Sequence, residues 1–147
     1  MNGPPERLAV VRGWIQKAEN DLKNAAWTLK IEGDCPTDTA CFHAQQCIEK
    51  YLKALLSWRG TDFPKTHDLG RLLLLLPASE RPALDANEAG RLSEYATVMR
   101  YPGDDPPIPL AEARAAVKIA RQIRRHVRLL LPPELLRRAG KNTRAGE

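Results

Sequence analysis

Hydrophobic residues recur every three or four positions along most of the chain, which is the spacing of one face of an α-helix. No stretch of useful length alternates apolar and polar residues as a β-strand does. The pattern predicts helices at about 4–33, 39–59, 66–77, 83–99 and 110–131, separated by segments rich in glycine and proline. Four or five helices with short connections predict an all-α fold, an antiparallel up-down bundle.

The 147 residues suffice for one domain with its own hydrophobic core. Pro132 and Pro133 end the last predicted helix, and the residues after them are basic with few large apolar side chains. We therefore expect one helical domain at 1–131 and a basic, disordered tail at 132–147. The apolar run at 72–76 is too short to span a bilayer, and the N-terminus lacks a secretory pattern, so we expect a cytoplasmic protein.

The net charge of +5 is unevenly placed along the chain. Residues 1–108 hold 13 lysines and arginines against 15 acidic residues, whereas residues 109–147 hold 10 against 3. In the last predicted helix the basic residues share one face, opposite an apolar stripe that contains Ala116, Ala120, Ile123, Val127 and Leu130. The members of this basic face are Arg114, Lys118, Arg121, Arg125 and Arg128.

Two interpretations of the basic face stay open. It is either a solvated surface that keeps the protein in solution or a surface that binds RNA, a nucleotide or an acidic protein. Residues 109–147 contain no aromatic side chain on which bases could stack, and this weakens the RNA interpretation.

The predicted helix at 39–59 carries polar residues inside its apolar pattern. On a helical wheel Gln45 and Glu49 fall among apolar neighbours, whereas Gln46, Lys50 and Lys53 fall on the outward face. A half-buried carboxylate needs a cation or a hydrogen-bond donor. We predict that Glu49 pairs with Arg100; the alternative is that Glu49 reaches solvent at the edge of the apolar arc.

Three segments, "FHAQQCIEKYLKALL", "THDLGRLL" and "RYP", occur in this order and resemble the HEPN family over about residues 12–131. HEPN domains are antiparallel helical bundles that tend to dimerise, and many are encoded beside a small nucleotidyltransferase. The resemblance implies a homodimer that partners such an enzyme in a two-component, toxin-antitoxin-like system and binds a nucleotide or RNA. The predicted nucleotide- or partner-binding residues are Lys50, Lys53, Arg100, Tyr101, Arg114, Lys118, Arg121 and Arg125.

Some HEPN proteins are ribonucleases with an Arg-x(4–6)-His motif near the start of the last helix. Arg100 matches that arginine, but Asp, Pro and Pro occupy 105–107, where the histidine would stand. Arg121 and His126 fit the spacing farther along and are weak catalytic candidates, since on one helix they point about 140° apart. The alternatives to a nucleotidyltransferase partner are a ribonuclease that uses this displaced pair, with a site composed across a dimer, or a pure protein-interaction module.

The sequence indicates no metal site and no cofactor. Cys35, Cys41 and Cys47 form no Cys-x-x-Cys pair, and we expect them to be reduced. The three histidines are scattered, and we expect His67 to cap or pack at the start of the third predicted helix.

Overall fold

The computed structural model describes residues 5–98 and 100–137. Within these ranges the chain is helical without strands, so the predicted all-α class is confirmed. The helices are α1 (Pro5–Thr28), α2 (Thr37–Arg59), α3 (Leu69–Leu74), α4 (Ala86–Thr97), α5 (Leu110–Leu130) and α6 (Pro133–Leu136), with a 3₁₀ turn, η1, at Ala78–Glu80. Two expected helix ends, Pro4 and Met99, lie outside the described residues. None of these helices has the length and apolar character needed to cross a membrane.

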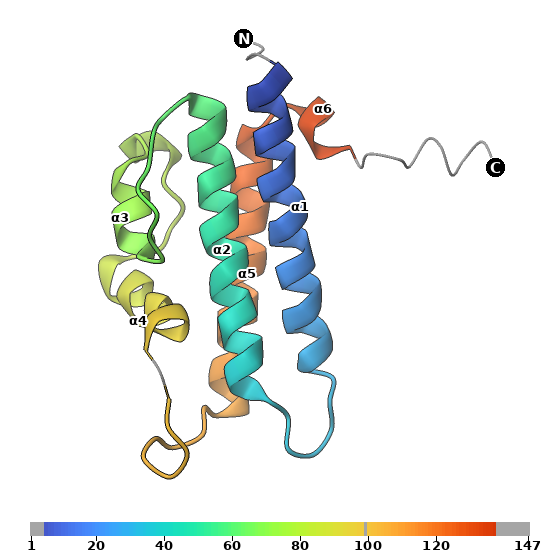
Figure 1. The fold of residues 1–147 in the computed structure, drawn as a ribbon, viewed down its shortest axis with the longest axis vertical. Helices are drawn as coiled ribbons and strands as arrows, with labels where there is room; N and C mark the ends of the chain where they lie inside the picture. Colours follow the sequence, from blue (N-terminus) through green and yellow to red (C-terminus); the bar gives the residue numbers. More distant parts are fainter. Residues whose placement is uncertain (1–4, 99, 138–147) are drawn as a thin grey trace, which may run out of the picture.

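The three long helices, α1, α2 and α5, form the body of the bundle (Figure 1). α1 and α2 are antiparallel, whereas α5 runs in the same direction as α2, because α3 and α4 return the chain to the end where α2 begins. The apolar stripe predicted for the last helix is the face of α5 that packs inward. Ala116, Ala120, Ile123 and Val127 are all buried there.

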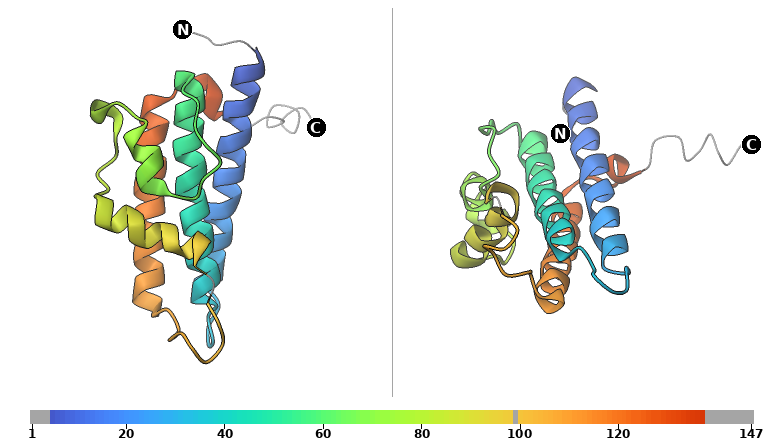
Figure 2. Two further views of the ribbon diagram at one scale, coloured as in Figure 1. Left: turned by 60° about the vertical axis from the view of Figure 1, so that its left-hand side comes forward. Right: turned by 60° about the horizontal axis from the view of Figure 1, so that its bottom comes forward.

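α2 is the central helix, with α1, α3, α4 and α5 all packed against it (Figure 2). The prediction that Gln46, Lys50 and Lys53 face outward is therefore wrong. Gln46 is 8% exposed, Lys53 is 7% exposed, and Lys50 is half-buried. A helical wheel gives the angular spacing of side chains, but the number of faces that neighbouring helices cover depends on the tertiary arrangement.

The crossover from α2 to α5 is fixed by capping side chains. Asp68 caps α3 by accepting from the backbone amide of Arg71 at 3.3 Å, and Asp85 caps α4 by accepting from Glu88 at 2.8 Å. Ser93 on α4 accepts from the backbone amide of Leu69 at 2.9 Å and thereby ties the two helices together.

The segment predicted as a tail, 132–147, contains a short helix near its start. Pro132 and Pro133 end α5, but Pro133 also occupies the first turn of α6, where a missing amide hydrogen costs nothing. α6 packs against α1 with Leu135 buried, and Arg12 on α1 donates to the backbone carbonyl of Glu134 at 3.4 Å. The rest of the predicted tail, 138–147, lies outside the described residues.

Candidate functional site

Four buried polar side chains of α2, Gln45, Gln46, Glu49 and Lys53, lie together with the exposed His67 from the loop before α3, and we call these five residues the α2 polar cluster. The Glu49 carboxylate accepts from Lys53 Nζ at 2.9 Å and lies 2.8 Å from His67 Nδ1. Gln45 Nε2 donates to Glu49 Oε1 at 3.2 Å and to the backbone carbonyl of His67 at 3.0 Å. Burial raises the pKa of Glu49, but the hydrogen bonds from His67 and Lys53 outweigh it and hold that pKa below its usual 4.5.

The prediction that Glu49 pairs with Arg100 is wrong. The cation beside Glu49 is Lys53, one turn farther along α2, and the loop before α3 folds back to place His67 on the other carboxylate oxygen. Arg100 instead donates to the backbone carbonyl of Pro106 within its own loop. His67 thus pairs with Glu49, while its neighbour Asp68 is the cap of α3.

Lys50 and Lys53, both predicted to bind a ligand, are engaged inside the protein. Lys53 Nζ lies 5.5 Å from the ring centre of Trp14 and 5.7 Å from that of Phe63, in addition to its ion pair with Glu49. Lys50 donates to Asp21 at 2.5 Å, and Asp21 also contacts His43 Nδ1 at 2.8 Å. These lysines therefore contribute to packing between α1 and α2.

Glu19 on α1 connects all three long helices. Its carboxylate accepts from Arg124 on α5 at 2.7 and 3.2 Å and from the Tyr51 hydroxyl on α2 at 2.5 Å. The Tyr51 hydroxyl accepts in turn from Arg128 at 3.2 Å. Burial raises the pKa of Glu19, yet the hydrogen bonds from Arg124 and Tyr51 lower it below the usual value, so Glu19 is ionised at neutral pH. Arg124 and Arg128 are held in place by this network.

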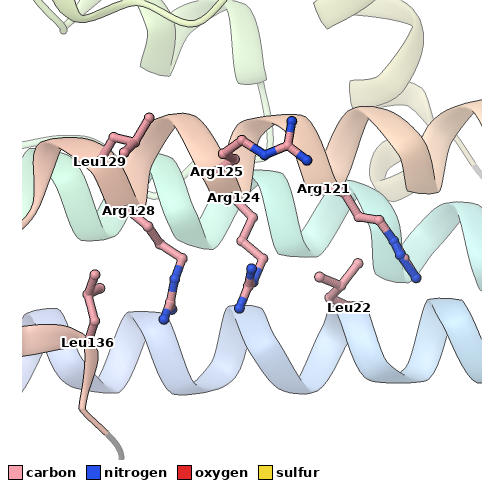
Figure 3. A pocket seen from close by; sticks show the side chains of 7 residues that line it. All are labelled: Leu22, Arg121, Arg124, Arg125, Arg128, Leu129 and Leu136. Carbon is pink, nitrogen blue, oxygen red and sulfur yellow. The ribbon is translucent and has the colours of Figure 1, made fainter. Parts of the chain in front are cut away.

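Beside this network a groove opens between α1, α5 and α6, with a volume of about 450 Å³ (Figure 3). We call it the arginine groove; it is lined by Leu22, Arg121, Arg124, Arg125, Arg128, Leu129 and Leu136. Arg124 and Arg128 extend from α5 towards α1, whereas Arg125 and Leu129 lie on the other edge of α5 (Figure 3). Planar guanidinium groups gathered in an open groove are suited to phosphate or carboxylate groups.

Comparison with protein families finds a match to the HEPN domain over residues 11–130. The chain belongs to the HEPN domain family. Among solved structures, it is similar to the crystal structure of ST0689, an archaeal HEPN homologue, with 29% sequence identity and a TM-score of 0.63. That similarity covers 80% of this chain and 94% of the archaeal one. A search of curated proteins finds no match.

Within this HEPN domain the three segments that suggested the family lie on different elements. The glutamine-rich block forms the middle of α2, His67 and Asp68 precede α3, and Arg100 opens the proline-rich loop before α5. The first two segments meet in the α2 polar cluster through Glu49 and His67, whereas Arg100 takes no part in it.

Arg121 and His126, the weak catalytic candidates, point to different parts of this HEPN domain. Arg121 lines the arginine groove, next to α1. His126 Nε2 lies 2.6 Å from the backbone carbonyl of Glu80 in η1, which belongs to the crossover. Within one chain the two side chains therefore do not converge on a shared substrate position.

The remaining predicted binding residues are spread over two other surfaces. Arg114 and Lys118 are exposed on α5 but do not line the groove. Arg100 borders a second cavity of about 280 Å³ between the start of α2, the end of α4 and the proline-rich loop. Tyr101, the next residue in that loop, is exposed. Arg124 is the groove arginine that the sequence did not single out, although its spacing of three and four from Arg121 and Arg128 is the signal for a shared surface.

The described residues hold no group of three or more histidine, cysteine or acidic side chains arranged for a metal ion. The three cysteines are free, and Cys41 and Cys47 are buried. Burial raises the pKa of the Cys41 thiol to about 11 and raises that of Cys47 as well, so both thiols are protonated at neutral pH.

Proposed function

We propose that this HEPN domain protein is the helical partner of a small nucleotidyltransferase in a two-component, toxin-antitoxin-like system. We further propose that the arginine groove binds the phosphate groups of a nucleotide or of RNA. The observation that carries the ligand proposal is the gathering of four arginines on one open groove: Arg121, Arg124, Arg125 and Arg128. Bidentate hydrogen bonds from arginine are among the strongest that proteins make to phosphate.

The charge of the groove is incompletely balanced. Across residues 5–98 and 100–137, Glu19 is the acidic side chain that pairs with a groove arginine, and it pairs with Arg124. Arg121 and Arg125 are exposed and form no ion pair within those ranges. Like charges placed side by side repel one another, and a bound anion relieves that repulsion.

A second surface, around the second cavity, is suited to contact with a protein partner. Phe42 and Val98 are exposed apolar residues that line the second cavity, near the end of the bundle where α2 and α5 begin, and the exposed Tyr101 follows Arg100 of that lining in the chain. Exposed apolar residues gathered in this way are typical of protein interfaces. We assign this surface to protein contacts, with the nucleotidyltransferase or with a second copy in the proposed homodimer.

Calorimetric titration with ATP and with a single-stranded oligoribonucleotide tests the ligand. Replacing Arg121 and Arg125 by glutamine removes two charges without touching the Glu19 network, and we expect affinity to fall by about 100-fold. The matched control, Arg114→Gln with Lys118→Gln, removes the same charge from the same helix outside the groove and should change affinity by less than about threefold. Equal losses in both double variants would show that net charge, and not the groove, binds the ligand.

Co-expression with a small nucleotidyltransferase encoded in the adjacent gene tests the partner. The proposal predicts a complex that stays together during size-exclusion chromatography. Substituting Val98 or Tyr101 by aspartate should dissociate it, while the groove double variant should leave it intact. Separate elution of the two wild-type proteins at micromolar concentration would contradict the partnership.

A further inference from the structure

The arginine groove contains only two kinds of side chain, and this composition indicates how it selects a ligand. We propose that it takes a nucleoside polyphosphate and distinguishes ligands by the number of phosphates, with little preference among bases. The inference rests on the proposed function and names the ligand class of the same site. It follows from the fixed and free arginines, from the apolar remainder of the lining, and from the position of Glu19.

The four arginines fall into two pairs. Arg124 is oriented by both oxygens of Glu19, at 2.7 and 3.2 Å, and Arg128 is oriented by the Tyr51 hydroxyl at 3.2 Å. Arg121 and Arg125 form no side-chain hydrogen bond within the described ranges and are exposed. One phosphate can therefore bind at the two oriented guanidinium groups, which extend towards α1, and further phosphates can recruit Arg121 beside them and Arg125 on the other edge of α5. Affinity should rise with phosphate number because each contact is a charge-assisted hydrogen bond.

The other residues that line the groove cannot distinguish one base from another. The other residues are Leu22, Leu129 and Leu136, and Leu129 is 81% exposed. Leucine contacts a ribose or a base through dispersion alone, so it does not distinguish hydrogen-bonding edges. The lining includes no amide, hydroxyl or aromatic side chain. Discrimination among bases depends on such hydrogen bonds, because an unmatched polar group in the site is what penalises the wrong ligand.

The same composition favours a free nucleotide over a strand of RNA. Proteins that hold single strands combine a basic path with aromatic side chains on which successive bases stack. This groove supplies the charge without the aromatic platform. Its volume of about 450 Å³ lies within the range of small-molecule sites.

The Glu19 carboxylate accepts hydrogen bonds from the Arg124 guanidinium, as a phosphate group would. A bound phosphate at Arg124 and Arg128 therefore lies close to an ionised carboxylate, which repels it. Replacing Glu19 by glutamine keeps an acceptor for Arg124 and Tyr51 but removes the negative charge. We expect triphosphate affinity to rise by about three- to tenfold in Glu19→Gln. If the role of Glu19 were purely structural, Glu19→Gln would lower the stability of the protein and would leave triphosphate affinity unchanged or reduced.

The test is a titration series at fixed ionic strength with AMP, ADP, ATP, GTP, UTP and inorganic tripolyphosphate. We expect affinity to rise by about tenfold for each added phosphate, and the three nucleoside triphosphates to agree within about threefold. Tripolyphosphate should bind within about tenfold of ATP, since the leucines add only modest dispersion.

The outcomes separate this inference from the proposed function. Equal affinity for AMP and ATP, or a preference of more than tenfold for one base, would overturn the phosphate-number inference while phosphate binding itself stands. Binding of the oligoribonucleotide without binding of ATP would also overturn it and would identify RNA as the ligand. If neither binds at millimolar concentration, the proposed ligand function is wrong as well.

Discussion

The α2 polar cluster and the arginine groove both contain charged side chains, but the charges are paired in the cluster and only partly paired in the groove. In the cluster, Glu49 is buried and each of its oxygens has a partner, Lys53 or His67. In the groove, Arg121 and Arg125 are exposed and have no acidic partner among the described residues. Charge that is fully paired inside a protein specifies packing, whereas surplus charge in an open groove is available to a ligand.

The largest expected effect comes from breaking the pairing in the cluster. Glu49→Ala leaves Lys53 buried without a counter-charge, and removal of one member of a buried pair typically costs about 3–5 kcal/mol. Urea denaturation followed by circular dichroism measures this loss. A loss of less than about 1 kcal/mol would show that Lys53 reaches water easily and that the cluster is not a structural element.

Acid should weaken the same cluster. The folded-state pKa of Glu49 lies below its ordinary 4.5, so its contribution to stability is fully present above that ordinary value and is lost as the pH falls through the folded-state pKa. We expect the free energy of unfolding to fall as the pH drops from about 5.5 to about 3. Glu49→Gln, which cannot ionise, should flatten this dependence. An equal slope in the variant would assign the acid sensitivity to other carboxylates, Glu19 among them.

The bounds of α2 illustrate how much the sequence could predict. The expected helix at 39–59 and the observed Thr37–Arg59 end at the same residue, because Gly60 adopts the left-handed conformation that terminates a helix. The basic face of the last helix also followed from spacing alone, and Arg121 and Arg125 of that face line the groove.

The partners across the bundle could not be predicted in this way. The lysine that pairs with Glu49 was placed outside because a wheel does not show that Trp14 of α1 and Phe63 of the loop after α2 lie over it. The second partner, His67, reaches Glu49 only through the path of a loop. The contact that orients Arg124 could not be predicted either, because Glu19 lies 105 residues earlier in the chain. Each of these contacts depends on tertiary arrangement, which local periodicity does not encode.

Salt should have a smaller effect than the substitutions, and it should affect the groove more than the cluster. Raising sodium chloride from about 50 to about 500 mM shortens the screening length to a few ångströms and weakens contacts between exposed charges. We expect ATP affinity to fall by about tenfold, while the urea midpoint changes little because the Glu49–Lys53 pair is buried. An ATP affinity insensitive to salt would contradict binding through exposed arginines.

The most direct measurement is the ATP affinity of two variants, compared at a temperature where both are folded. Arg121→Gln with Arg125→Gln should lose about 100-fold in affinity and retain its free energy of unfolding within about 0.5 kcal/mol. Glu49→Gln should bind ATP as tightly as the wild type despite a lower free energy of unfolding. Wild-type ATP affinity in the groove variant, or its loss in Glu49→Gln, would contradict the division between a structural cluster and a ligand-binding groove.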